Sequence, residues 1–337
     1  GWLPRNYRSG STCQKGTRSC PRGMQGELYF DWRTIINPPE VQAMASEIEY
    51  TKIISDEECA KAQAAADAAS HLSADQIDPP TFYVHQNYDR YTDENHAVWR
   101  ELYDRRWSVL ASQASQTFLA GLEAINLVRD RVPMLDGQQT WKGQQINGIN
   151  TYLWPLTRWQ SRAVPGYLPA KAFFACLARR EFPTTIAIRP RDKMDYLPEP
   201  DIFHDIFGHV PLHADAVFAD FLQTYGKAAL HCDDPADIER LGRLFWFTVE
   251  FGLIREKGKL RIYGSGLISS HGEADYALNS PVPERRPFDL DRVCDTTFEI
   301  DKFQPIYYVL ESFEQLRDAM NNYANRVLNS RPAAAAH

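Results

Sequence analysis

Apolar residues recur every three or four positions in several long stretches of the chain, as expected for helices that bury one face. In residues 96–120 this pattern predicts one long helix, and it predicts further helices over 168–182 and 216–227. Pro169 stands near the first position of the second helix, where a proline is tolerated because its missing N–H would have no partner there. Helices are therefore expected to dominate the structure.

A short strand is predicted around Leu260–Tyr263, before a glycine-rich turn. Other strands are expected to be short as well, and the sequence shows no repeat and no βαβ alternation. These features favour a mainly α protein, an α-rich α+β fold with a single catalytic domain over residues 81–330.

The first 80 residues are expected to form an N-terminal extension of unknown role. Within it, Ser55 can cap an alanine-rich helix over 55–70, and the prolines after Asp78 break that helix. Residues 1–23 are basic and lack the apolar stretch of a secretory signal. They can be vector-derived, with Met24 as the natural start.

The composition, with 44% apolar and 24% charged residues, is that of a globular protein. No apolar run is long enough to cross a membrane, and a net charge of −7 argues against a nucleic-acid partner. The six cysteines form no CxxC pair, which favours reduced thiols and a cytoplasmic location. We expect a monomer or a weak oligomer.

His204 and His209 are the first candidates for metal chemistry. On a continuous α-helix, five steps of about 100° would turn the second side chain roughly 140° away from the first. Gly208 and Pro211 can end the helix between them, so that His204 lies on its last turn and His209 on its exit.

Glu250 is the best candidate for a third ligand. It stands within LFWFTVEFG, and an ionised carboxylate among so many apolar groups needs a charge partner or a metal. Two histidines and one carboxylate, with open positions, form the ligand set of mononuclear iron(II) oxygenases. Zinc hydrolases use the same ligand types, so the residues alone leave iron and zinc both open.

Two simpler interpretations compete with this site. A single histidine in a helix is more often structural than a metal ligand. His213 also offers a rival pair, because it stands four residues after His209, but Pro211 between them disfavours one continuous helix. We therefore expect His213 to lie beside the site or on the surface.

Arg189 is a candidate for binding a substrate carboxylate, because its planar guanidinium can bind two oxygens at once. Glu199 and Asp201 follow it in the sequence and could orient its side chain. They could equally be ordinary surface acids, and the spacing does not decide between these roles.

Several long strings of the chain resemble the pterin-dependent aromatic amino acid hydroxylases, with the greatest likeness to bacterial members that act on phenylalanine. The resemblance runs from about Tyr88 to Phe313, roughly two-thirds of the chain. The strings that carry it, in order, are RYTDENHAVW, WQSRAVPGYLP, YLPEPDIFHDIFGHVPL, FWFTVEFGLI, IYGSGLISS and FQPIYYVLESF.

The resemblance implies iron(II) on His204, His209 and Glu250, and a tetrahydropterin beside it, either tetrahydrobiopterin or a related pterin. Dioxygen would be activated through a ferryl intermediate that hydroxylates the ring, and no further catalytic residue is implied. The implied pterin contacts are Gly166, Leu168, Phe173, Asp205 and Phe245. The implied contacts of the amino acid are Arg189, Pro200, Phe182, Trp246, Gly266 and Ser269.

The same resemblance favours L-phenylalanine as substrate and L-tyrosine as product. Related tryptophan hydroxylases carry phenylalanine where Trp246 stands, and tyrosine hydroxylases carry aspartate where Ile300 stands. This chain departs from the family where Phe245 replaces a tyrosine, Ser265 an alanine and Ala187 a bulky aromatic residue. These departures leave open meta-hydroxylation of phenylalanine, hydroxylation of tryptophan, or an inactive homologue that binds iron or pterin.

Overall fold

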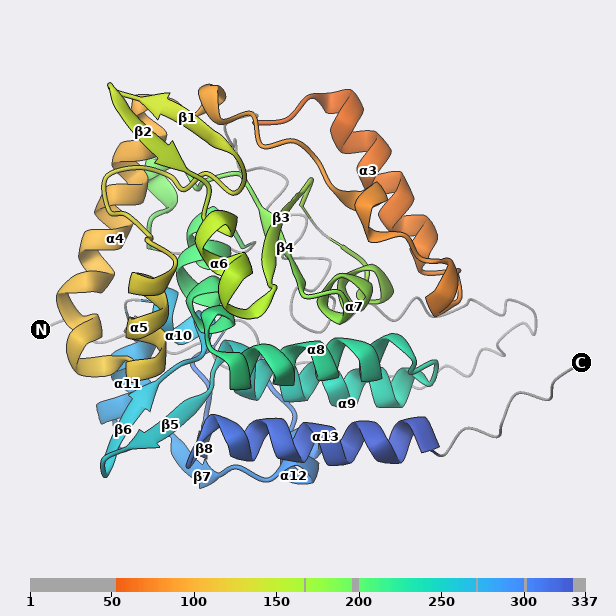
Figure 1. The fold of residues 1–337 in the computed structure, drawn as a ribbon. Coiled ribbons are helices and arrows are strands. Elements are labelled where there is room, and N and C mark those ends of the chain that lie inside the picture. The colour runs from red at the N-terminus through yellow and green to blue at the C-terminus, as the bar shows by residue number, and fades with distance from the viewer. Residues whose placement is uncertain (1–52, 167, 196–199, 271, 300–301, 330–337) are drawn as a thin grey trace, which may run out of the picture.

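The computed structural model describes residues 53–166, 168–195, 200–270, 272–299 and 302–329, without the side chains of 327–329. Helices predominate, which confirms the predicted mainly α class (Figure 1). The α-helices are α3 (Asp56–Ala69), α4 (Asp93–Gln113), α5 (Gln116–Ala124), α6 (Asn150–Thr157), α7 (Ala170–Ala178), α8 (Ala216–Leu230), α9 (Pro235–Phe245), α10 (Ser265–Ser269), α11 (Gly272–Asn279), α12 (Leu290–Asp295) and α13 (Phe313–Asn329). The 3-10 helices are η1 (Ala74–Gln76), η2 (Pro79–Phe82), η3 (Tyr88–Arg90), η4 (Arg191–Lys193) and η6 (Val210–Ala214), and the π-helices are η5 (Phe203–His209) and η7 (Trp246–Glu250).

The described strands form three small sheets rather than one large one. They are β1 (Gln138–Trp141), β2 (Gln144–Asn147), β3 (Gln160–Val164), β4 (Glu181–Thr185), β5 (Leu253–Glu256), β6 (Lys259–Ile262), β7 (Glu284–Pro287) and β8 (Ile306–Leu310). β1 and β2 make an antiparallel hairpin, and the four-stranded sheet has the order β6-β5-β8-β7. In that sheet only the β5–β6 pair is antiparallel. The strand predicted at Leu260–Tyr263 corresponds to β6.

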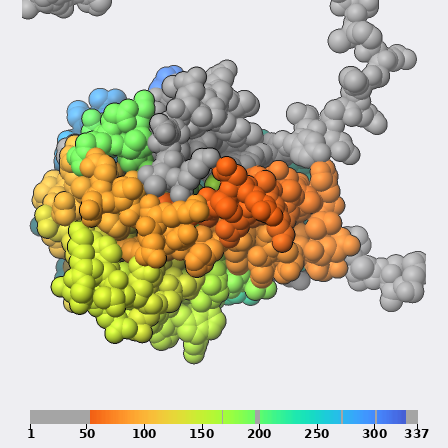
Figure 2. Space-filling model, turned by 90° about the horizontal axis from the view of Figure 1, so that it is seen from above, coloured from red at the N-terminus to blue at the C-terminus, as the bar shows by residue number. Residues whose placement is uncertain are grey.

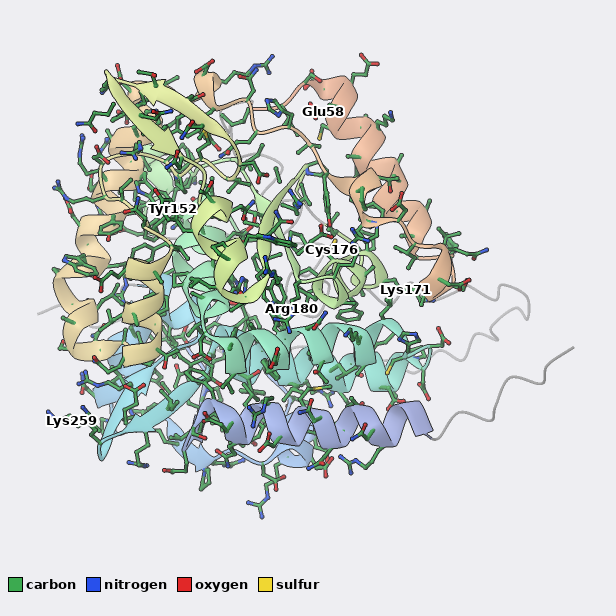
Figure 3. All side chains as sticks on the ribbon, viewed as in Figure 1. Glu58, Tyr152, Lys171, Cys176, Arg180 and Lys259 are labelled. Carbon is green, nitrogen blue, oxygen red and sulfur yellow. The ribbon has the colours of Figure 1, made fainter. Side chains whose placement is uncertain are left out.

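Among the described residues two parallel strand pairs are joined through a helix, β3–α7–β4 and β7–α12–β8, although no βαβ alternation was expected from the sequence. β3 and β4 pair in parallel, with Gln160 opposite Glu181, and α7 connects them. The helix predicted over 168–182 is therefore too long, because its last residues, including Phe182, pair with β3 instead. At the turn before β4, Arg180 adopts a positive φ and its Nε donates to Gln223 on α8 at 3.0 Å (Figure 3).

The single helix predicted over 96–120 is two helices, α4 and α5. They separate at Ala114, which pairs with Ile262 of β6. The backbone N–H of Ser115 donates to the Ile262 carbonyl at 2.8 Å, and the Ser115 hydroxyl accepts from Phe118 N at 3.2 Å to begin α5. At Ser115 the backbone N–H thus bonds to strand β6 and not to the preceding helix turn. The apolar periodicity of the sequence nevertheless continues through the break.

The described part of the N-terminal extension contributes to the hydrophobic core. Ser55 caps α3 as predicted, with its hydroxyl 3.2 Å from Glu58 N. One face of α3 is buried, and Glu58 Oε1 accepts from the backbone N–H of His85 at 2.6 Å (Figure 3). Figure 2 shows α3 and the residues after it, in red to orange, on the same face as the β1–β2 hairpin.

On the other side of the molecule α8, α9 and α13 form a layer of helices, and α8 packs against α13 within this layer and against the shorter α7 above it (Figure 1). A Cβ added to Gly226 of α8 would lie 2.6 Å from the Ala178 backbone N, so glycine allows α7 and α8 to approach closely. Among the described residues, no helix is long and apolar enough to span a membrane.

Candidate metal centre

His204 and His209 both lie within the π-helix η5, where their Nε2 atoms are 3.2 Å apart. The expected helix break between them is wrong. A π-helix bonds each residue to the one five positions away, so its wider turn brings side chains five residues apart towards the same side. Gly208 has another role, because an added Cβ there would lie 3.1 Å from the Cβ of Ser265 on α10.

Glu250 is the last residue of the second π-helix, η7, and is buried. Its Oε1 is 3.2 Å from His209 Nε2, and its Oε2 is 3.6 Å from His204 Nε2. Glu250 stands 41 positions after His209 and 46 after His204, yet the three residues singled out in the sequence place their polar atoms together.

The electrostatics of the site favour a neutral His204 and an ionised Glu250. Burial lowers the pKa of His204 to about 4, although the charge of Glu250 opposes this shift. Burial alone would raise the pKa of Glu250, but His209, His204 and a hydrogen bond from Ser265 lower it to about 2. Near neutral pH the group therefore offers one imidazole lone pair from His204 and a negative charge from Glu250.

This arrangement fits a divalent metal. Metal–ligand bonds of about 2.1 Å set neighbouring ligand atoms about 3.0 Å apart at right angles and about 3.4 Å apart at tetrahedral angles. The separations of His209 Nε2 from His204 Nε2 and from Glu250 Oε1, both 3.2 Å, are close to these values, and the other carboxylate oxygen lies 3.6 Å from His204 Nε2. Two nitrogens and one carboxylate suit non-haem iron(II), and the geometry alone also suits zinc.

Asp205 is a second carboxylate close to the histidines. One of its oxygens lies within 4.8 Å of ring nitrogens of His204 and His209. Its Oδ2 accepts from Thr185 N on β4 at 2.7 Å, whereas both oxygens of Glu250 lie within 3.6 Å of a ring nitrogen. The shorter separations favour Glu250 over Asp205 as the third ligand.

A serine on α10 determines which nitrogen of His204 carries the proton. The Ser269 hydroxyl is 2.8 Å from the Ser265 carbonyl, to which it donates, and 3.0 Å from His204 Nδ1. Because a hydroxyl has one proton, Ser269 must accept from Nδ1–H, which leaves the lone pair of His204 on Nε2. The sequence suggested Ser269 only as a substrate contact, and nothing in its spacing indicated this bond.

Arg189 and Asp201 form a buried ion pair. The guanidinium Nε and Nη2 donate to the two carboxylate oxygens at 2.8 and 2.9 Å. Asp201 also accepts from the backbone N–H of His204 at 3.0 Å. Asp201 is therefore not a surface acid, and the suggestion that a carboxylate orients Arg189 agrees with its position.

Aromatic rings surround the histidines. The Phe182 ring lies 4.8 Å from that of His209, and Phe173 of α7 packs edge-on against both Phe182 and Phe245. Phe245 in turn lies 6.3 Å from His209. Phe182, a predicted substrate residue, and Phe173 and Phe245, two predicted pterin residues, thus form one aromatic wall beside the candidate ligands.

His213 is completely buried, so the surface position considered from the sequence is excluded. Its ring stacks on Trp159 at 4.7 Å and lies 4.9 Å from Phe182. Burial holds its pKa well below the usual value, and the side chain is therefore a neutral member of the core.

Gly166 and Leu168, the other predicted pterin residues, lie between β3 and α7. Gly166 adopts a φ of +157°, and a Cβ added to it would meet no described atom within 4 Å, so its backbone borders open space. Leu168 is buried just before α7. Pterin contacts at Gly166 and Leu168 stay a prediction.

Trp246 opens η7, four residues before Glu250, and its ring stacks on Phe298 at 4.4 Å. Its indole N–H donates to Gln304 Oε1 at 3.1 Å, a partner that the sequence gave no signal for. Gly266 lies against Glu250 and Phe251, where an added Cβ would be 3.0 Å from the Glu250 carbonyl oxygen. Pro200 is half-buried just before Asp201. Contact of Trp246, Pro200 and Phe182 with the bound amino acid stays a prediction.

Tyr167, Glu199 and Ile300 lie outside the described residues. Ala187 is described, and its carbonyl accepts from the backbone N–H of Ile202 at 2.8 Å.

Comparison with known proteins places these features in a family. The model of the biopterin-dependent aromatic amino acid hydroxylases matches residues 81–334. The chain is 46% identical to a phenylalanine-4-hydroxylase of Ralstonia nicotianae over 240 residues, which cover 71% of this chain and 73% of that one. It is 38% identical to the tyrosine 3-monooxygenase of Rattus norvegicus over 241 residues, covering 70% and 46% of the two chains.

Solved structures agree with the sequence comparison. The phenylalanine hydroxylase of Chromobacterium violaceum with bound iron(III) and 7,8-dihydrobiopterin superimposes with a TM-score of 0.66 and 42% identity. The match covers 74% of this chain and 88% of that chain. A structure of the same enzyme bound to cobalt matches with the same TM-score and 41% identity.

Proposed function

The chain belongs to the biopterin-dependent aromatic amino acid hydroxylases, and from this premise we propose that it converts L-phenylalanine to L-tyrosine. As a member of this family it is a non-haem iron monooxygenase that uses a tetrahydropterin and dioxygen. The observation that carries the proposal is the convergence of His204, His209 and Glu250, whose polar atoms lie 3.2–3.6 Å apart.

These three residues would hold the iron, and Phe173, Phe245, Gly166, Leu168 and Asp205 would hold the pterin. Iron(II) and a reduced pterin, when bound together, supply the electrons that activate dioxygen for ring hydroxylation. Ser269 keeps the Nε2 lone pair of His204 available, and Glu250 supplies the negative charge that favours a divalent cation.

Arg189 would bind the carboxylate of the amino acid. Its Nε and Nη2 contact Asp201 and its Nη1 donates to the Met194 carbonyl at 3.4 Å, and we propose that the substrate carboxylate binds at the edge that carries Nη1 and Nη2. Asp201 fixes the guanidinium in one orientation, and this fixes the direction in which the ring of a bound amino acid extends. Gly266 and Pro200 are further proposed substrate contacts.

The aromatic wall would exclude water from the reacting ring. Phe182 lies against His209, and Phe245 closes the gap towards Phe173. An apolar surrounding protects reactive species from side reactions with water and packs against a phenyl ring without a hydroxyl partner.

Phenylalanine is the substrate that the surroundings of Trp246 support. The indole is held between Phe298 and Phe251 and is bonded to Gln304, so it occupies space that a larger substrate ring would need. Relatives named phenylalanine-4-hydroxylase, at 46% and 44% identity, add to this support.

A cytoplasmic location and a monomeric or weakly oligomeric state are part of the same proposal. Cys176 and Cys294 are buried thiols, and burial raises the pKa of each to about 12, which makes them unreactive. Such thiols suit a reducing compartment.

The test is a hydroxylation assay on the purified chain loaded with iron(II), with tetrahydrobiopterin and dioxygen. Phenylalanine, tyrosine and tryptophan are supplied separately, and products are identified by chromatography and mass spectrometry. We expect pterin-dependent formation of tyrosine from phenylalanine, and sharply reduced turnover in Glu250→Gln. A meta-hydroxylated or tryptophan-derived main product would overturn the substrate proposal. No pterin-dependent product from any of the three amino acids would overturn the proposed activity.

A further inference from the structure

The hydroxyl of Ser265, the first residue of α10, is directed at the carboxylate of Glu250. Its Oγ is 2.6 Å from Glu250 Oε2 and 3.3 Å from the Val249 carbonyl oxygen. A serine has one proton to donate, and the shorter contact to a charged oxygen is the stronger one. Ser265 thus donates to Glu250, at a position where the family resemblance leads to the expectation of alanine.

Close backbone packing brings this serine to the carboxylate. A Cβ on Gly264 would lie 2.4 Å from the Glu250 carbonyl oxygen, so only glycine allows α10 to begin against η7. On the other side, Gly208 of η5 leaves room for the Cβ of Ser265. The first turn of α10 is therefore held between the two π-helices that carry the candidate ligands.

Two hydroxyls four residues apart on α10 contact two different candidate ligands. Ser269 lies beside His204 Nδ1, and Ser265 contacts Glu250 Oε2. The two serines are also joined, since Ser269 donates to the Ser265 carbonyl at 2.8 Å. A displacement of α10 would therefore alter both ligands together.

We propose that Ser265 is a positioning residue of the metal centre, which occupies Glu250 Oε2 and so presents Oε1 to the metal. This inference rests on the proposed function, because it assumes that Glu250 is a ligand. Oε1 is the oxygen 3.2 Å from His209 Nε2, whereas Oε2 is 3.6 Å from His204 Nε2. A hydrogen bond to one oxygen limits rotation of the carboxylate, which otherwise could offer either oxygen or both.

The experiment measures cobalt(II) binding to the metal-free chain by its visible absorption spectrum, which reports both affinity and ligand arrangement. In Ser265→Ala we expect the Kd for cobalt(II) to rise roughly 10–100-fold, as for other residues that orient a metal ligand. At saturation its spectrum should differ from that of the unsubstituted protein, because Glu250 can bind in another way. A purely structural role would change thermal stability without changing the spectrum.

Thr248→Val is the matched control. Thr248 lies on η7, two residues before Glu250, is buried, and donates its hydroxyl to the Leu244 carbonyl at 2.5 Å rather than to a ligand. Its Kd and spectrum should equal those of the unsubstituted protein. If Ser265→Ala does not fold, Ser265→Gly, which also removes the hydroxyl and adds no metal-binding group, should give the same changes in Kd and spectrum.

The outcomes separate this inference from the proposed function. An unchanged Kd and spectrum in Ser265→Ala, with weakened binding in Glu250→Gln, would overturn the role of Ser265 and leave the metal centre standing. Equal changes in Thr248→Val would also overturn it, because any lost hydroxyl would then have the same effect. If Glu250→Gln binds cobalt(II) as tightly as the unsubstituted protein, both proposals fail.

Discussion

Arg189 binds both carboxylate oxygens of Asp201, and Asp201 in turn accepts from the backbone N–H of His204. One fully buried carboxylate thus connects the proposed substrate-binding cation with a proposed iron ligand. Asp201 needs these donors because an ionised carboxylate without partners would be very costly to bury. Burial alone would raise the pKa of Asp201, but the nearby Arg189 lowers it below its usual value, which keeps the ion pair charged.

Replacing Arg189 by lysine is expected to raise the KM for phenylalanine about 10–100-fold, because the loss of one charge-assisted hydrogen bond costs about 1.5–3 kcal/mol. A lysine is a point charge and cannot bind Asp201 and a substrate carboxylate in the same fixed geometry. Steady-state kinetics at saturating pterin and iron would measure the change. Arg105→Lys, which alters a partly exposed arginine paired with Glu101, is the control and should behave as the unsubstituted enzyme. Equal KM values in Arg189→Lys and the unsubstituted enzyme would remove Arg189 from the site.

Replacing Ser269 by alanine should weaken metal binding roughly 10-fold or more, because His204 Nδ1–H loses the acceptor that fixes the tautomer. Calorimetric titration of the metal-free protein with cobalt(II) would measure this. The neighbouring Ser270→Ala is a close control, since the Ser270 hydroxyl accepts from Glu273 N at the start of α11. If both variants bind metal equally weakly, the effect comes from altered packing of this segment and not from the tautomer.

The residue types of the site could be predicted from the sequence, but the way they meet could not. The histidines, the stranded carboxylate and Arg189 were identifiable because charged groups in apolar surroundings need partners. The π-helix was not identifiable, because its wider turn depends on packing against α10 and not on any local sequence signal. The apolar periodicity of residues 96–120 likewise continues through the break between α4 and α5.

Bonds between distant elements explain most of the other differences. Ser265 and Glu250 stand 15 positions apart, and Trp246 and Gln304 stand 58 apart. Neither pair lies on one helix face or one strand pair, so periodicity carries no information about them. Phe182 was assigned to a helix because its apolar neighbours suit one, whereas parallel pairing of β4 with β3 determines its conformation.

Replacing Gln304 by leucine is expected to destabilise the protein by about 1–3 kcal/mol, because the buried indole N–H of Trp246 loses its acceptor. Gln304 is itself fixed, since its backbone N–H donates to Glu273 at 2.9 Å and its Nε2 donates to the Glu299 carbonyl at 2.7 Å. A more mobile indole should also reduce the preference for phenylalanine over tryptophan. Urea unfolding and a competition assay would measure the two effects. Gln315→Leu on α13, away from Trp246, is the control, and an unchanged substrate preference in Gln304→Leu would count against a role in specificity.

Gly226→Ala is expected to destabilise the packing of α7 on α8. The added Cβ would lie 2.6 Å from the Ala178 backbone N and from the Leu177 side chain, closer than real contacts allow. The two helices would have to separate, at a cost of about 1–3 kcal/mol for an overpacked core. Urea unfolding would measure it. Gly258→Ala is a useful contrast. The positive φ of Gly258 makes alanine unfavourable there, but an added Cβ would meet no described atom within 4 Å. A larger loss at Gly258 than at Gly226 would mean that α7 and α8 adjust easily.

Acid should destabilise the fold partly through His96. This residue is buried on α4, where its Nδ1 accepts from the backbone N–H of Val132 at 3.1 Å. Burial, with a smaller contribution from Lys142, lowers its pKa from 6.5 to about 4. Above pH 6.5 the side chain is neutral in the folded and unfolded states and contributes no pH dependence. Between pH 6.5 and about pH 4 the unfolded state gains the proton and the folded state does not. The free energy of unfolding therefore decreases as the pH is lowered.

The loss should reach roughly 1–2 kcal/mol at pH 5.5 and about 3 kcal/mol near pH 4. Comparing His96→Gln with the unsubstituted protein isolates this contribution, because all other acidic and basic groups are shared. Glutamine can still accept the Val132 hydrogen bond but does not titrate. Urea unfolding at pH 7.5, 5.5 and 4.5 should therefore show the unsubstituted protein losing stability faster than the variant as the pH falls. Parallel losses in the two proteins would mean that His96 takes up its proton equally in both states, and the buried imidazole would then have no part in the acid sensitivity.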